Sequence, residues 1–154
     1  MLEDLKSLFR GNNFIGQIIL INAIVFLIEN LIANLSPEIG IQITRWFAMH
    51  SYLPTVLTSP WTIVTYMLFH GGFQHLFWNM IMLYWFGRIV NDFMGRERLI
   101  GLYFTGGIAG ALFYLAVYSF RMLTGEEGLV DYPLVGASAG IMALVAFAGF
   151  RFGD

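Results

Sequence analysis

The sequence contains no cysteine, and only 12% of its 154 residues are charged. Without cysteine there can be no disulfide bond, no thiol nucleophile and no thiolate metal ligand. The 8 lysine and arginine residues are scattered and form no basic stripe, so binding to nucleic acid is not expected. The HExxH motif of zinc proteases is also absent. These absences argue against a metalloprotein and against a nucleic-acid-binding protein.

Hydrophobic residues, in contrast, make up 58% of the chain, against roughly 45–50% in a soluble domain. A chain of this length cannot bury that excess in a soluble core, so several segments are expected to face lipid. We therefore predict an all-α membrane protein, a polytopic helical bundle that forms a single unit over residues 1–154. Four apolar runs are the predicted spans, at residues 14–35, 73–90, 99–120 and 137–150.

The basic residues between these runs orient the chain. With a cytoplasmic N-terminus, the inner set is Lys6, Arg10, Arg88, Arg96, Arg98 and Arg151, and the outer set is Arg45 and Arg121. The positive-inside rule therefore favours a cytoplasmic N-terminus, with Ser138 and His75 toward the opposite side. The first run is too long for a secretory signal, and no small-x-small cleavage site follows it, so we expect it to remain as a span.

The connection at residues 36–72 is long and rich in apolar residues. It is interrupted by Pro37, Pro54 and Pro60, so it does not continue as another span. Its tryptophans suit the boundary between membrane and water. We predict a folded loop with short helices that lie partly in this interface.

Polar residues inside the apolar runs need an explanation, because polar groups at membrane depth usually face the protein interior and often mark function. They are Asn22, Glu29, His70, His75, Asn79 and Ser138. We expect Glu29 to lie near the outer end of its helix or to bond to the long loop. His75 and Asn79 are four residues apart, about 40° around a helix, so both project from one face.

Each polar motif taken alone has a structural explanation. A His-x-x-x-Asn pair is more often a hydrogen-bonding pair between helices than a catalytic pair. Gly136 and Gly140 form a small-xxx-small pattern, which more often marks close helix packing. Gly106 and Gly110 repeat that pattern in the third run, and there we predict packing alone.

The combination of these residues favours catalysis more than any one of them does. A serine attacks a carbonyl only when a base takes its proton and when donors are aimed at the oxyanion that forms. Amides in the first turn of a helix have no intrahelical partner, so a serine placed there supplies such donors itself. His75 and Asn79, on a neighbouring helix, are suited to supply the others.

At this point two stretches, "HGGFQHLFWN" and "GASAG", resemble the motifs of the rhomboid intramembrane serine proteases. In that family a histidine on a loop precedes His-x-x-x-Asn in the second core helix, and a Gly-x-Ser motif opens the fourth. The long interfacial loop that carries Trp61 also matches. The resemblance extends from about Phe14 to the end of the sequence, and it implies a bundle of rhomboid type with four of the six core helices.

The resemblance also implies a role for each motif residue. Ser138 would be the nucleophile, and His75 and Asn79 would line the oxyanion hole together with the Ser138 amide. His70 would support the loop and the floor of the site. The backbone of the motif would shape the turn at the nucleophile through Gly136, Ala137 and Ala139.

The same resemblance sets expectations for partners and location. The substrates would be transmembrane segments of other proteins, cut near the non-cytoplasmic face of the lipid bilayer. No metal, nucleic acid or other cofactor would take part. We expect a multi-pass protein of a bacterial inner membrane.

Several positions depart from the family pattern. Ala139 stands where glycine is usual, Thr62 where arginine is frequent, and Met142 where an aromatic residue often stacks on the catalytic histidine. That histidine, the general base, lies on the sixth core helix of the family and has no counterpart here. We therefore predict that this chain alone is not a competent protease, and that Gly140, Ala143 and Ala146 form an exposed face of the fourth helix.

Two other functions stay open at this stage. The missing base and Met142 are compatible with a non-catalytic rhomboid-like module that binds membrane segments. A fragment of a transporter or channel would explain the intramembrane polar residues. That second alternative is weak, because no second half with matching broken helices is present.

Overall fold

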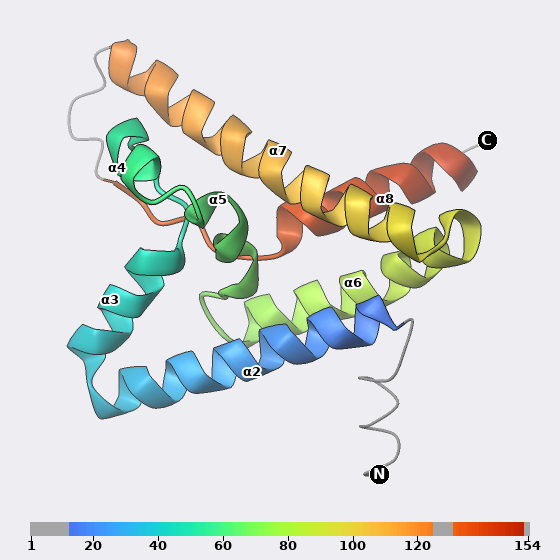
Figure 1. The fold of residues 1–154 in the computed structure, drawn as a ribbon, viewed down its shortest axis with the longest axis horizontal. Helices are drawn as coiled ribbons and strands as arrows, with labels where there is room; N and C mark the ends of the chain where they lie inside the picture. The colour runs from blue at the N-terminus through green and yellow to red at the C-terminus, as the bar shows by residue number, and fades with distance from the viewer. Residues whose placement is uncertain (1–12, 125–130, 153–154) are drawn as a thin grey trace.

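Helices account for nearly all regular structure in the computed structural model, which describes residues 13–124 and 131–152. The four longest helices are α2 (Phe14–Leu35), α6 (Phe73–Met94), α7 (Arg96–Leu123) and α8 (Ser138–Phe152). The connection between α2 and α6 contains α3 (Pro37–Phe47), α4 (Leu53–Thr58), α5 (Thr62–Thr65) and the 3-10 turn η1 (Tyr66–Leu68). The predicted all-α fold class is confirmed (Figure 1).

Two of the long helices, α2 and α7, are long and apolar enough to cross a membrane by length and composition. That α6 and α8 also cross it stays a prediction. α6 ends at Met94 rather than at residue 90, and α7 begins at Arg96 rather than at residue 99. The apolar runs understate both helices because polar and charged residues continue the helical backbone beyond the lipid-facing part.

A single glycine joins α6 to α7. Gly95 has φ +80°, in the left-handed region that ends helices and that favours glycine. Its N–H bonds to the Asn91 carbonyl, and its own carbonyl accepts the Leu99 N–H. The same residue therefore caps one helix and begins the next.

α8 packs against α7 and α6, and its contact with α7 is very close. A Cβ on Gly106 would lie 2.4 Å from the Cβ of Ala143, and a Cβ on Gly110 would lie 2.4 Å from that of Ala139. Only hydrogen at these positions lets the two backbones approach so closely. The prediction that Gly106 and Gly110 serve packing is confirmed.

The prediction that Gly140, Ala143 and Ala146 form an exposed face of α8 is wrong for the first two residues. A Cβ on Gly140 would lie 2.6 Å from the Tyr103 carbonyl of α7, and Ala143 is covered by Gly106. The exposed face instead carries Ser138, Met142, Ala146 and Gly149. Small residues mark a close contact, but they do not tell which neighbour makes it.

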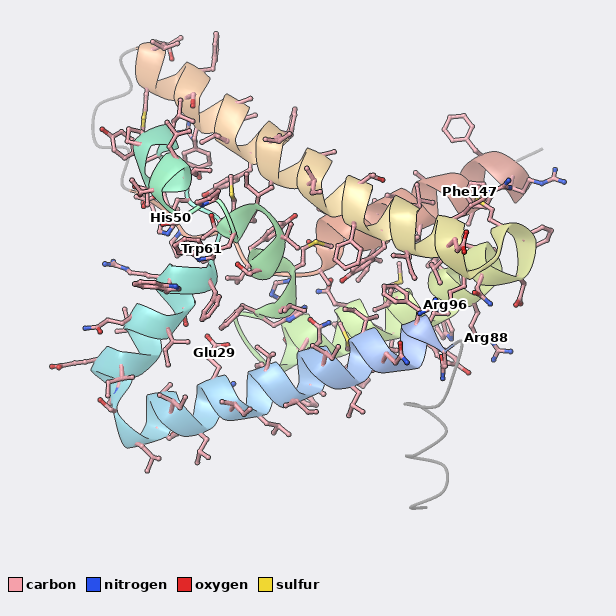
Figure 2. The ribbon with its side chains drawn as sticks, viewed as in Figure 1. Glu29, His50, Trp61, Arg88, Arg96 and Phe147 are labelled. Atoms are coloured by element: carbon pink, nitrogen blue, oxygen red, sulfur yellow. The ribbon has the colours of Figure 1, made fainter. Side chains whose placement is uncertain are left out.

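The connection from α2 to α6 is folded, with its elements tied to the long helices. The Thr44 hydroxyl of α3 donates to the Glu29 carboxylate of α2 at 2.5 Å, which confirms the expected bond of Glu29 to the long loop. The Trp61 indole N–H donates to the Trp46 carbonyl, and the two rings stack at 5.7 Å. Figure 2 shows Trp61 and His50 near one end of the molecule and Arg88 and Arg96 at the other.

Candidate active site

Ser138 occupies the first position of α8, and its side chain is exposed. The Ala137 carbonyl accepts the Ile141 N–H at 3.1 Å and so closes the first turn of the helix. The first amides of an α-helix have no acceptor within it, so the Ser138 N–H points away from the helix body. The hydroxyl and the amide of Ser138 are thus presented together at one helix terminus.

Gly136 makes the turn into this helix. Its φ of +125° is rare for residues with a side chain, and its N–H donates to the Tyr66 carbonyl at 2.9 Å. A Cβ on Gly136 would lie 2.8 Å from both Cε1 and Nε2 of His75, and 3.8 Å from the Ser138 Oγ. The tip of the His75 ring and the Ser138 hydroxyl therefore flank the same backbone position.

His75 lies in the first turn of α6 and is half-buried. The Gly71 N–H donates to its Nδ1 at 3.4 Å, so in the neutral ring the proton lies on Nε2. Nε2 is also an atom in close contact with Gly136. An N–H donor from α6 is thereby held beside Ser138.

His70 is buried beneath this turn, between η1 and α6. Its Nε2 accepts the Ala137 N–H at 3.4 Å, and its ring meets the His75 ring edge to face at 5.0 Å. Burial, reinforced by the neighbouring His75, lowers the pKa of His70 to about 4. His70 is therefore neutral near pH 7, as an acceptor for the Ala137 amide must be.

Asn79 is buried one turn after His75, and its side chain bends back along its own helix. The amide Nδ2 donates to the His75 carbonyl at 2.7 Å. This bond uses one of its two N–H groups and leaves the other for a further acceptor. The same bond connects Asn79 to the residue whose ring touches Gly136.

The two alanines of the motif face the interior. Ala137 is fully buried, and the Ala139 Cβ lies against Gly110 of α7. Both therefore fix the position of the turn and of the helix, and neither lies on the exposed side that Ser138 occupies.

Sequence patterns did not indicate two further supports of the site. Tyr66 holds Gly136 through its carbonyl, and its hydroxyl donates to the Gly107 carbonyl of α7 at 2.7 Å. Met49 and Leu134 exchange two backbone hydrogen bonds, of 3.0 and 2.8 Å, as an isolated antiparallel bridge. Backbone pairing between residues so far apart leaves no local signal in the sequence.

Within residues 13–124 and 131–152, no three histidine, aspartate or glutamate side chains gather closely enough to hold a metal ion. The geometry at Ser138 is instead that of a hydroxyl with N–H donors around it. One is its own amide, and another is His75 Nε2, beside Gly136. Such a set can hold an oxyanion that forms on a carbonyl attacked by the hydroxyl.

Comparison with known families supports this interpretation of the fold. A family model described as the Rhomboid domain matches residues 57–153, more than half of the chain, from α4 through α8. The chain belongs to the rhomboid family. Its members are membrane proteins that include intramembrane serine proteases.

Curated relatives carry rhomboid names. The chain is 28% identical to the mitochondrial presenilin-associated rhomboid-like protein of Rattus norvegicus over 92% of its own length and 33% of the relative's. It is 30% identical to the mitochondrial RHOMBOID-like protein 12 of Arabidopsis thaliana over 54% of its length and 27% of the relative's. The chain is 25% identical to the chloroplastic Rhomboid-like protein 16 of the same plant, over 77% of its own length and 36% of the relative's. The chain spans about a third of the length of these relatives.

These names bear on the expected location. They place the relatives in mitochondria and chloroplasts, so they give no support to a bacterial inner membrane. Membership of a family of membrane proteins, together with the apolar helices α2 and α7, does support a membrane protein.

Proposed function

We propose that this rhomboid chain carries the nucleophile and the oxyanion donors of an intramembrane serine protease. The observation that carries the proposal is the contact of His75 Nε2 with Gly136, two residues before an exposed Ser138 at a helix N-terminus. A packing serine has no need of an imidazole N–H held beside it. A nucleophile does, because the oxyanion it creates must be stabilised.

In the proposed reaction Ser138 Oγ attacks a peptide carbonyl of a transmembrane segment, and a general base passes the Oγ proton to the leaving amine as the C–N bond breaks. Water then hydrolyses the acyl-enzyme, which releases the new carboxyl end and restores the hydroxyl. The Ser138 N–H, His75 Nε2–H and the second N–H of Asn79 are the proposed oxyanion donors. The general base is not among the histidines present. His50 and His70 bond elsewhere, and His75 accepts the Gly71 N–H through Nδ1 and presents Nε2–H as a donor. We place that base on an element that packs over the exposed face of α8.

We also propose an orientation. The arginines 88, 96 and 98 mark the cytoplasmic end, and Ser138 lies toward the opposite side, as the positive-inside rule favours. Substrates would then be cut near the non-cytoplasmic face. That this chain alone is inactive stays a prediction.

The test compares the full-length protein with its Ser138→Ala variant, each reconstituted in liposomes with a transmembrane reporter. We expect the cleavage rate of the variant to be at least about 1,000-fold lower than that of wild type, since the nucleophile is removed. His75→Ala should lower the cleavage rate about 100-fold, because one oxyanion donor is removed. Equal cleavage by wild type and Ser138→Ala would contradict the proposal.

The second candidate is a rhomboid-like module that binds membrane segments without cutting them. Met142 favours it, because this residue is 58% exposed on the face that carries Ser138, where an aromatic residue would stack on a catalytic histidine. A fluorophosphonate probe distinguishes the two functions, since it reacts only with an activated serine. Labelling of Ser138 supports the protease, and its absence supports the binding module.

A further inference from the structure

His50 and Asp131 form a partly buried contact between two loops, and the two residues are 81 positions apart in sequence. His50 Nδ1 lies 2.6 Å from Asp131 Oδ2, and His50 Nε2 lies 2.9 Å from the Arg45 carbonyl. The His50 side chain is 11% exposed and that of Asp131 is 35% exposed. Neither residue belongs to the motifs around Ser138, and the proposed chemistry uses neither.

The two partners of His50 are both acceptors. A neutral imidazole has one N–H, so it can donate to Asp131 or to the Arg45 carbonyl, but not to both. His50 Nδ1 makes the shorter of the two contacts, at 2.6 Å to Asp131. A hydrogen bond between an imidazole N–H and a carboxylate is charge-assisted and therefore of the strong type.

Asp131 is also fixed by a second residue of the same loop. Its Oδ1 accepts the Ser51 N–H at 2.9 Å and the Ser51 hydroxyl at 3.1 Å, and Ser51 is fully buried. The carboxylate therefore accepts three bonds from two adjacent residues. Its position relative to the loop at residues 48–51 is fixed in more than one direction.

The segment that follows Asp131 leads directly to the nucleophile. Leu134 pairs with Met49 through two backbone bonds, and Gly136 bonds to the Tyr66 carbonyl. The Tyr132 carbonyl accepts the Tyr114 hydroxyl of α7 at 2.7 Å. The segment 131–136 is thus tethered along its length, and the His50–Asp131 hydrogen bond is the tether at its start.

We infer that His50 and Asp131 are positioning residues for Ser138. They hold the segment 131–136 in the register that places Gly136 against His75 and presents Ser138 beside the oxyanion donors. The inference rests on the proposed protease function and deepens it. The inference gives neither residue a contact with substrate, so the pair should affect the rate of the chemical step and leave substrate binding unchanged.

The test uses the full-length protein in liposomes, with kcat and KM measured for a transmembrane reporter and normalised to folded protein. His50→Ala removes both bonds of the ring. Asp131→Asn keeps an acceptor for Ser51 and replaces the carboxylate that bonds to His50, so it tests this hydrogen bond without leaving a buried serine unpaired. His50→Gln keeps an N–H donor without a charge, which preserves the test where His50→Ala does not fold.

We expect His50→Ala and Asp131→Asn each to lower kcat about tenfold, with KM within about twofold of wild type, because displacement of a nucleophile costs rate rather than affinity. The double variant should be no slower than the slower single variant, since both break one pair. Fluorophosphonate labelling of Ser138 should slow by the same factor. Asp92→Asn, which removes an exposed carboxylate of α6, is the matched control and should leave kcat unchanged.

Two outcomes separate this inference from the proposed function. If Ser138→Ala cleaves as fast as wild type, the protease function itself is wrong. If Ser138→Ala is inactive while the His50 and Asp131 variants keep wild-type kcat per folded molecule, the positioning role is wrong and the protease function stands. Variants that lower only the yield of folded protein would also overturn the positioning role, because they show a purely structural pair.

Discussion

The loop half of the molecule, residues 48–75 and 131–138, is held together differently from its arginine end, residues 13–20 and 84–101. In the loop half, hydrogen bonds join segments far apart in sequence, such as Met49 to Leu134 and Ala137 to His70. At the arginine end, side chains bond within their own helix, as Arg88 does to the Tyr84 hydroxyl at 2.9 Å. One half is fixed by hydrogen bonds between distant segments, whereas in the other the helices pack through apolar side chains, such as Ile15 of α2 against Gly87 of α6.

The difference follows from where backbone groups find partners. A helix satisfies its own amides and carbonyls, so its ends can be open to water or to lipid headgroups. In a loop that enters the membrane interface, the backbone amides and carbonyls lack partners within the loop, so they must bond to other segments. These bonds between distant segments also fix atoms relative to one another, and a catalytic arrangement needs such fixed positions.

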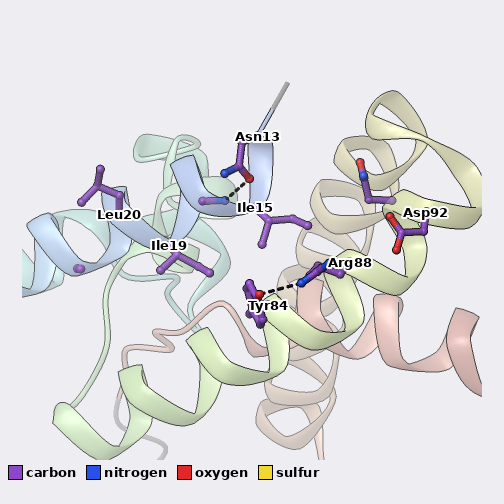
Figure 3. Close-up of a pocket in the computed structure, with 10 residues that line it drawn as sticks. Asn13, Ile15, Ile19, Leu20, Tyr84, Arg88 and Asp92 are labelled. Carbon is purple, nitrogen blue, oxygen red and sulfur yellow. Dashed lines mark hydrogen bonds between the residues drawn. The ribbon is translucent and has the colours of Figure 1, made fainter. Parts of the chain in front are cut away.

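The arginine end accordingly leaves open space between its helices. A groove of about 610 Å³ lies between α2 and α6, and Arg88, Tyr84 and Asn13 are among the residues that line it (Figure 3). The side-chain bonds from Arg88 to Tyr84 and from the Gly16 N–H to Asn13, both in the groove lining, are local. Changes here should therefore matter less than changes of similar size in the loop half.

Gly136→Ala should have the largest effect. The new Cβ would meet the His75 ring at 2.8 Å, at a φ of +125° that alanine rarely adopts. We expect about a 100-fold loss of reporter cleavage per folded molecule. The matched control is Gly101→Ala in α7, where a Cβ meets no atom within 4 Å. That variant should keep full activity and gain about 0.5–1 kcal/mol of stability, and a comparable loss in both would erase the contrast between the halves.

The pH dependence of His70 should give the next largest effect. Its folded-state pKa of about 4 lies below the ordinary value of 6.5, so the unfolded chain binds the proton more readily. Stability from this residue is thus present above pH 6.5 and is lost as pH falls toward 4, up to about 3 kcal/mol. Protonation also removes the acceptor of the Ala137 amide.

The measurement for His70 is unfolding in detergent between pH 4 and 7, for wild type and for His70→Gln. The glutamine carbonyl can accept the Ala137 N–H and does not titrate, so its curve should be flatter. Carboxylates titrate in both proteins, and the difference between the two curves isolates His70. Parallel curves would mean that folding does not lower the pKa of His70, and the predicted pH dependence would be wrong.

Tyr84→Phe should have the smallest effect. It removes only the bond between Arg88 and an exposed hydroxyl at the arginine end. We expect the free energy of unfolding to change by less than about 0.5 kcal/mol and cleavage to stay within twofold of wild type. A larger loss of cleavage would show that the arginine end is coupled to Ser138, and the comparison would have to be abandoned.

Much of the helical framework was accessible from sequence, because apolar runs long enough for a membrane leave few alternatives to a helix. The order of the motifs also indicated which residues to consider around Ser138, and the structure brings His70, His75 and Gly136 together beside it. Their catalytic roles stay predictions. What made them accessible was local spacing, such as four residues from His75 to Asn79.

Two features could not be predicted from the sequence, for the same physical reason. Which face of α8 is covered depends on the helix that lies next to Gly140 and Ala143. Sequence periodicity shows which residues share a face of a helix, but it does not show which helix packs against that face. The partner of His50 lies 81 residues away, with no pattern that links the two. Both are properties of tertiary contact, so only the folded chain reveals them.

The single-residue joint at Gly95 has a consequence for biogenesis. α6 contains His75 and Asn79 of the site and does not qualify as a membrane span by composition, whereas α7 does. Only Gly95 separates the two helices, so they form a helical hairpin with no room for an intervening loop. We predict that the polar helix enters the bilayer as one arm of this hairpin, with the hydrophobicity of α7 driving the insertion of both.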